Sequence, residues 1–227
     1  GCFVASIPTL PVYRGELQGP CLGMATAVFD AQGKVAGKDE KGELVCTVPF
    51  PSKPIGFWGD KENEKYLSAY FEGFPGVWTH GDFASVSETG GFTLYGRSDA
   101  TLNSKGVRIG TAEIYRVVET FPQIQESMAV SQDWDNDTRV VLFVVVKEGQ
   151  LFNEEIAKEI KRALRDQASP RHVPDKIIVA PELPRTKSNK LVELAVTDVI
   201  NGREVRNRDA LANPGALDWF KDLADLK

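Results

Sequence analysis

The sequence predicts an α+β protein with a β-rich first part and a small α+β domain after it. Up to Arg97, short apolar runs alternate with turns rich in glycine and proline, a pattern typical of short strands. After Arg97, strand-like runs alternate with two segments whose apolar residues recur at helical spacing. The second part is therefore expected to run strand–helix–strand–strand–helix–strand. A chain of 227 residues has room for one large domain or two small ones.

The first part is expected to contain two hairpins and one short helix. The first hairpin closes on a turn ending at Gly33, and the second crosses the glycine pair Gly90-Gly91. Trp78 to Asp82 is expected to end in a turn, because Gly81 precedes the aspartate. The expected strands are 26–29, 42–48, 84–86 and 92–95, and the expected helix is 62–71.

The second part is anchored by two helices with clear signals. The first, 111–121, carries an apolar stripe and stops before Pro122. The second, 153–168, begins at Asn153, a good N-cap, with Glu154 and Glu155 in its first turn. Strands are expected at 124–130, 140–146 and 177–179, with a turn over 133–137. We expect domains at 1–97 and 98–200, then a polar tail over 201–227 that ends in a short amphipathic stretch.

Composition argues against several classes of protein. A net charge of −5 argues against binding to a nucleic-acid backbone. The longest aliphatic run, 140–146, is too short to span a bilayer, so no membrane partner is expected. The cysteines Cys2, Cys21 and Cys46 are odd in number and lack metal-ligand spacing. They predict free thiols in a reducing compartment, the cytoplasm, and no metal site.

Residues 95–114 are the most informative segment. Arg97, Lys105 and Arg108 stand around flexible backbone at Gly96 and Gly106. Cationic side chains on a glycine-rich loop suit a phosphate-rich ligand. Taken alone, the segment is equally compatible with a solvated basic loop.

One carboxylate, Asp82, and one lysine, Lys190, are further candidate site residues. Asp82 follows Gly81 at the expected turn, where an aspartate commonly bonds its own backbone. Lys190 ends the run Pro184-Arg185-Thr186-Lys187-Ser188-Asn189-Lys190, and a lone lysine is usually a solvated charge.

In this order, Trp78–Asp82, residues 95–114 and Pro184–Lys190 resemble the closing motifs of the adenylate-forming acyl-CoA synthetase superfamily. Over nearly its whole length the chain is similar to the C-terminal third of the acetoacetyl-CoA synthetase family. The segments that carry this likeness are 8–18, 74–78, 101–103, 107–108, 169–174, 199–205 and 213–214. Acetyl-CoA and other short-chain acyl-CoA synthetases are the alternative, because the acetyl-CoA enzymes share the central motif but not the tail.

The resemblance implies nucleotide contacts and one catalytic residue. Asp82 would accept both ribose hydroxyls of ATP, Arg97 would help to hold the ribose, and Arg108 would contact the phosphate of the adenylate. Lys190 would neutralise the charge that builds on the α-phosphate and the acyl carboxylate. Asp99 falls at the hinge position, about which the small domain turns.

The resemblance also implies contacts with CoA and a modification. Gly106 would line the pantetheine tunnel, where a side chain would obstruct the thiol. Lys105 and Arg171 are candidates for contacts with the CoA phosphates, although a solvated loop lysine and a polar helix face explain them equally well. Further basic residues, Lys161, Arg162 and Arg165, are equally compatible with a polar helix face. Lys190 would be a target of a lysine acetyltransferase and deacetylase, because acetylation removes the charge. Asn189 stands where the family has glycine, and asparagine tolerates the left-handed backbone.

The implied reaction has two steps and involves ATP, Mg²⁺, CoA and acetoacetate. Acetoacetate attacks the α-phosphate of ATP, and CoA then displaces AMP from the acetoacetyl-adenylate. Residues 1–97 would be the end of the large adenylating domain, and residues 98–200 the mobile small domain. The family's phosphate loop and Mg²⁺ segment would precede Gly1, so we expect the isolated chain to be inactive in adenylation.

Two other classes remain. The strand and helix order also suits an RNA-recognition domain, but the strand 140–146 has one aromatic residue and the chain is acidic. A catalytically inactive remnant of a synthetase would keep the fold without its contacts. The joint presence of Asp82, Arg97, Arg108 and Lys190 argues against a remnant.

Overall fold

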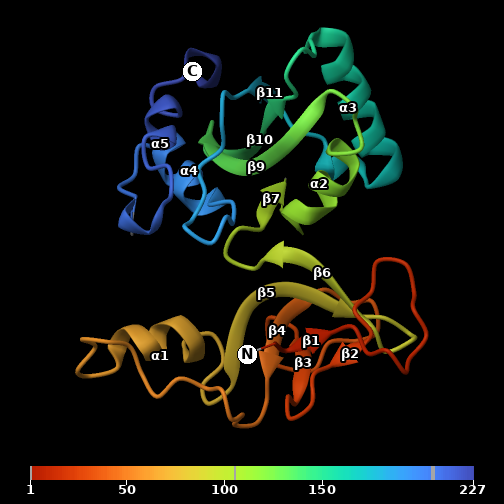
Figure 1. Cartoon of the computed structure of the whole chain (residues 1–227), viewed down its shortest axis with the longest axis vertical. Helices are drawn as coiled ribbons and strands as arrows, with labels where there is room; N and C mark the ends of the chain where they lie inside the picture. Colours follow the sequence, from red (N-terminus) through yellow and green to blue (C-terminus); the bar gives the residue numbers. More distant parts are fainter. Residues whose placement is uncertain (1, 105, 206–207) are drawn as a thin grey trace. The chain divides into compact units, whose positions relative to one another are not determined.

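The computed structural model describes residues 2–104, 106–205 and 208–227. The chain forms two compact units, Gly1–Asp99 and Ala100–Lys227 (Figure 1). The division falls two residues after the boundary expected at Arg97.

The first unit is built on an antiparallel four-stranded sheet in the order β3-β4-β5-β6. Its strands are β3 (Thr26–Phe29), β4 (Gly42–Cys46), β5 (Trp78–Val86) and β6 (Phe92–Arg97). A short pair, β1 (Val4–Ala5) and β2 (Gly19–Pro20), and the helix α1 (Glu64–Phe71) complete the unit. Its core is rich in aromatic residues, among them Phe3, Phe50, Tyr66, Trp78 and Phe92. Both expected hairpins and the helix are confirmed, with bounds shifted by a few residues.

The turn expected at Gly81-Asp82 is wrong, because both residues lie inside β5. Glu43 pairs with Phe83 and Val45 with Thr79, so residues 80–82 lie opposite the single residue Leu44. Gly81 has φ 82°, the left-handed conformation that a glycine supplies at a bulge. The glycine that was interpreted as a turn signal marks a β-bulge instead.

The second unit contains a three-stranded sheet in the order β11-β10-β9. β9 (Ile124–Trp134) and β10 (Asp137–Val146) are antiparallel, and β11 (Lys176–Val179) runs parallel to β10. The connection from β10 to β11 contains α3 (Glu154–Gln167) and the 3₁₀ helix η1 (Pro170–His172). A separate hairpin of β7 (Leu102–Ser104) and β8 (Val107–Ile109) precedes α2 (Thr111–Val118). The chain ends with α4 (Glu193–Ile200), η2 (Arg208–Ala210), α5 (Ala216–Trp219) and η3 (Ala224–Leu226).

Both faces of this sheet are covered, and alternate residues of β10 enter different cores. Leu142 and Val144 pack with α2 and α3, whereas Val141 and Phe143 pack with α4, α5 and the C-terminal residues. Figure 1 shows these helices on opposite sides of the strands. The unbroken apolar run 140–146 follows from this double burial.

Several expected elements of the second unit need correction. The turn over 133–137 is shorter: β9 and β10 meet across Asp135 and Asn136, which have φ 50° and 59°, as a two-residue hairpin turn requires. The first helix ends at Val118 rather than at residue 121. The end of the expected tail is folded onto the sheet, with Phe220 fully buried. The N-cap at Asn153 is confirmed, because its side chain accepts hydrogen bonds from Glu155 N and Ile156 N.

Candidate functional site

Asp82 and Arg97 lie side by side in the first unit, because β5 and β6 pair them directly. Arg97 Nη1 is 3.8 Å from Asp82 Oδ1 and donates to the His80 carbonyl at 3.3 Å. Its Nε and Nη2 donate to the two carboxylate oxygens of Asp99 at 3.2 and 3.0 Å. Asp82 Oδ2 is bonded to His80 Nδ1. One guanidinium therefore joins two of the predicted residues, Asp82 and Asp99.

The bulge at Gly81 supports this cluster. Glu43 Oε1 accepts hydrogen bonds from Gly81 N at 2.9 Å and from Ser98 Oγ at 3.1 Å. A Cβ on Gly81 would lie 2.6 Å from Arg97 Nη2, so the guanidinium occupies the space that only glycine leaves. His80 and Glu43 were not predicted as site residues; His80 lies inside the motif that carried the resemblance.

Arg97 is firmly cationic. Burial alone would lower its pKa, but the hydrogen bond and charge of Asp99 and the charges of Asp82 and Glu43 raise the pKa above its ordinary value. The cluster thus holds a permanent positive charge beside two carboxylates.

A cavity of about 550 Å³ opens beside this cluster within the first unit. Arg97 and Asp99 line it together with aromatic side chains, including Tyr70 and Trp78, whose rings stack at 3.8 Å. Trp78 Nε1 is buried and makes no hydrogen bond to the described residues. The lining combines flat apolar walls with a fixed cation.

In the second unit, Arg108 and Gly106 lie on the β7–β8 hairpin. Arg108 is exposed on β8, and its Nε donates to Thr101 Oγ1 at 2.8 Å. Gly106 has φ 80°, and in the described part of the chain, apart from its two chain neighbours, no atom lies within 4 Å of the position that its Cβ would take. Lys105, predicted beside it, lies outside the described residues.

Lys190 is exposed at the end of a tight turn. Thr186 N donates to the Lys190 carbonyl at 2.9 Å, and Lys190 N donates to Thr186 Oγ1 at 3.1 Å. Asn189 has φ 64°, so the predicted left-handed conformation is confirmed. Arg185 donates to the Asn189 carbonyl at 2.9 Å and forms an ion pair with Glu126, which fastens the turn to β9.

The predicted CoA-phosphate residues differ in their surroundings. Arg171 is exposed on η1, which contacts β8, the strand of Arg108. Lys161 donates to the Asp175 carbonyl at 3.0 Å, and Arg162 lies 3.7 Å from Asp166 one turn along α3. These contacts favour a polar helix face for Lys161 and Arg162.

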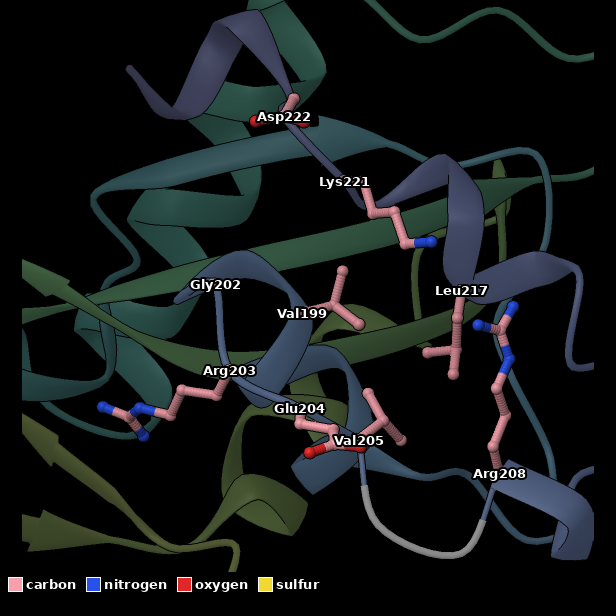
Figure 2. A pocket seen from close by; sticks show the side chains of 9 residues that line it. All are labelled: Val199, Gly202, Arg203, Glu204, Val205, Arg208, Leu217, Lys221 and Asp222. Carbon is pink, nitrogen blue, oxygen red and sulfur yellow. The ribbon is translucent and has the colours of Figure 1, made fainter.

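A second cavity of about 550 Å³ lies among the C-terminal residues of the second unit (Figure 2). Three cationic side chains line it, but each is held by a carboxylate. Arg203 pairs with Asp133, and Arg208 and Lys221 both pair with Asp218. The cavity therefore offers no free cation among the residues described here.

The described residues contain no group of three or more histidine, cysteine, aspartate or glutamate side chains suited to holding a metal ion. In the same residues, no helix combines the length and apolar character needed to cross a membrane.

Residues 113–190 match the family of the AMP-binding enzyme C-terminal domain. This segment of the chain is therefore similar to that domain. It is 55% identical to the acetoacetyl-coenzyme A synthetase of Rhizobium meliloti, over all of this chain and 35% of that protein. It is 44% identical to the acetoacetyl-CoA synthetase of Mus musculus, over all of this chain and 34% of that protein. The chain thus spans about a third of the length of these relatives.

The fold agrees with these relatives. The structure of acetoacetyl-CoA synthetase from Streptomyces lividans matches 98% of this chain and 34% of its own, with a TM-score of 0.91 and 39% identity. MatB from Rhodopseudomonas palustris, at 20% identity and a TM-score of 0.70, shares the fold. The predicted α+β class is confirmed.

Proposed function

We propose that this chain is the C-terminal third of an ATP-dependent acid–CoA ligase that converts acetoacetate, through acetoacetyl-adenylate, to acetoacetyl-CoA. The observation that carries the proposal is the match of the whole chain to acetoacetyl-CoA synthetases, at 55% identity in one of them. We assign residues 1–97 to the large adenylating domain and 98–200 to the small mobile domain, followed by the tail 201–227.

The Asp82–Arg97 cluster is assigned to the nucleotide. Asp82 would accept two hydrogen bonds from the ribose hydroxyls, and its side chain is 24% exposed, so its oxygens can be reached. Arg97 keeps its charge and is fastened to Asp99, which we assign to the hinge. The hydrogen bonds between Arg97 and Asp99 therefore connect a proposed nucleotide-binding residue to the last residue of the first unit.

Lys190 is assigned to catalysis of adenylation. Its ammonium stands at the end of a turn whose backbone is held by Thr186 and Arg185, so the cation is carried on a defined support. A positioned cation stabilises the charge that develops as the carboxylate attacks phosphorus. Acetylation of Lys190 by a lysine acetyltransferase would abolish this effect, and a deacetylase would restore it.

The β7–β8 hairpin is assigned to thioester formation. The open space around Gly106 suits the passage of a thin pantetheine chain, and Arg108 on the same hairpin suits the adenylate phosphate. Arg171 and Lys105 are assigned to the phosphates of CoA.

Mg²⁺ enters the proposal only as the companion of the ATP phosphates. On the resemblance, we assign its ligands to the upstream part of the large adenylating domain. We further propose a cytoplasmic location, in keeping with the three free cysteines.

The proposal is tested by a substrate panel with the full-length protein that contains this chain. We expect acid-dependent exchange of pyrophosphate into ATP to be fastest with acetoacetate, and CoA to release AMP from the adenylate. Faster exchange with acetate or another short acid would show that this acid, and not acetoacetate, is the substrate. Absence of exchange with every acid would contradict the proposed function.

A further inference from the structure

A buried histidine in the second unit is not used by the roles assigned above. His172, on η1, is only 6% exposed. Its Nδ1 lies 2.8 Å from Ser169 Oγ, and its Nε2 lies 3.4 Å from Glu113 Oε2. Nε2 is fully buried and makes no hydrogen bond of normal length within the described residues. The Glu113 carboxylate, 3.4 Å away, is the polar group that faces it.

The hydrogen bonds favour one arrangement of protons. Ser169 Oγ already accepts the Arg171 amide at 3.1 Å, so its hydroxyl proton can be donated to His172 Nδ1. The ring proton then lies on Nε2 and faces the Glu113 carboxylate. In this tautomer the imidazole joins η1 to α2 through Ser169 and Glu113.

Glu113 also contacts the residue that follows the β7–β8 hairpin. Its Oε2 also accepts the Gly110 amide at 3.0 Å, immediately after β8. The same carboxylate thereby fixes the start of α2, the end of β8 and the position of η1. Arg108 and Arg171, both exposed, stand on two of these segments.

The same helix makes a second buried polar contact in another direction. Tyr115 donates its hydroxyl to Glu193 Oε1 at 3.1 Å and accepts the Ala129 amide at 3.1 Å. Glu193 is the first residue of α4 and follows Lys190 by three positions. Tyr115 therefore fastens the segment that leaves the Lys190 turn.

We infer that α2 braces two functional segments independently: His172, acting through Glu113, positions the hairpin used with CoA, and Tyr115, acting through Glu193, positions the Lys190 turn. This inference rests on the proposed function. His172 and Tyr115 are positioning residues, because neither is assigned a contact with a substrate. Each should affect one half-reaction and spare the other.

The test compares His172→Ala, His172→Gln and Tyr115→Phe in the full-length protein. In His172→Ala we expect CoA-dependent release of AMP from the adenylate to fall about tenfold, with ATP–pyrophosphate exchange unchanged, as a small misplacement predicts. In Tyr115→Phe we expect ATP–pyrophosphate exchange to fall about tenfold, with CoA-dependent release of AMP from the adenylate unchanged. His172→Gln, whose amide can donate to Glu113, should recover part of the loss. Equal effects on both half-reactions, or no effect in either variant, would overturn the inference.

A second readout does not depend on activity. Amide hydrogen exchange in this chain should accelerate at Gly110 and η1 in His172→Ala, and at Asn189 and Lys190 in Tyr115→Phe, each variant sparing the other segment. If the wild-type protein shows no acid-dependent exchange of pyrophosphate, the proposed function fails, yet amide exchange still decides whether the two braces are independent. Acceleration of both segments in either variant would contradict their independence.

Discussion

At residue scale, Gly81 is required for two reasons: its left-handed backbone and the space that the Arg97 guanidinium occupies beside it. Gly81 and Gly76 have similar φ angles, 82° and 79°. Among the described residues beyond their chain neighbours, a Cβ at Gly76 would meet no atom within 4 Å, whereas a Cβ at Gly81 would lie 2.6 Å from Arg97 Nη2. Alanine at either position should therefore cost about 1 kcal/mol of stability from the left-handed backbone. Only Gly81→Ala should push the guanidinium away from His80 and Asp82.

The pair Gly81→Ala and Gly76→Ala separates these effects. We expect similar losses in the urea midpoint of the two variants, and a rise in the KM for ATP in the full-length protein that is confined to Gly81→Ala. A similar KM for ATP in both variants would show that the position of Arg97 does not matter for the nucleotide.

The individual residues of the candidate site could not be identified from their local chemistry alone. Nothing in the composition around Lys190 distinguishes it from Lys187, three residues earlier and also exposed. The resemblance singled out Lys190. Asp82 was found by the same route, and its local conformation was misjudged, because a left-handed glycine serves turns and bulges alike.

At the scale of elements, the turn before α4 depends on the left-handed conformation of Asn189. Asn189→Gly should keep or slightly raise stability, whereas Asn189→Val should lower it by about 1–2 kcal/mol, because a β-branched side chain is strained at φ 64°. Urea unfolding of the 227-residue chain measures both changes. Equal stability of the two variants would mean that the turn does not hold this conformation in solution.

The contact between α2 and α4 predicts a dependence on alkaline pH. Burial, followed by the charge of Glu193, raises the pKa of Tyr115 well above its ordinary value of about 10. The folded state then keeps the proton that the unfolded state releases, so this stabilisation is complete below pH 10 and is lost as the pH rises above it.

Tyr115→Phe removes both the hydrogen bonds and this titration. We expect the variant to be about 1–3 kcal/mol less stable at pH 7 and to lose less stability than the wild type above pH 10. Urea midpoints measured from pH 7 to pH 11 should therefore converge. Parallel curves for the two proteins would contradict the buried neutral tyrosine.

The elements that sequence reasoning found are those with a clear period. The helix α3 has an N-cap and a single apolar stripe, and both were confirmed. The helix α4 was missed, because Val192 provides no side-chain cap and the polar side formed by Glu193, Thr197 and Asp198 is interrupted by the exposed Leu194. The folding of the C-terminal residues onto β10 was missed as well, since it depends on contacts such as Phe143 with Phe220, which lie far apart in sequence.

At the scale of the whole molecule, each unit has hydrophobic cores of its own. The cluster around Phe3 and Trp78 contains only residues of the first unit, and the two clusters on either side of β10 contain only residues of the second. Residues 100–227 should therefore fold alone, with amide chemical shifts close to those of the same residues in the full chain. A fragment 100–227 with the narrow shift range of an unfolded chain would contradict this division.

The isolated chain should nevertheless be inactive in adenylation, since it spans about a third of the synthetases that it matches. Acetoacetate-dependent exchange of pyrophosphate into ATP by the purified 227 residues, at a rate comparable to that of the full-length protein, would contradict the assignment of the remaining parts to the upstream region.

The central claim, that this chain supplies the catalytic lysine of an acid–CoA ligase, is tested most directly by that exchange in the full-length protein. Lys190→Ala is compared with Lys187→Ala, which removes an equally exposed lysine of the same turn. We predict that Lys190→Ala lowers the rate by about 10²–10³-fold, the usual effect of losing one group that stabilises developing charge, while Lys187→Ala stays close to the wild type. Equal rates in all three proteins would contradict the account.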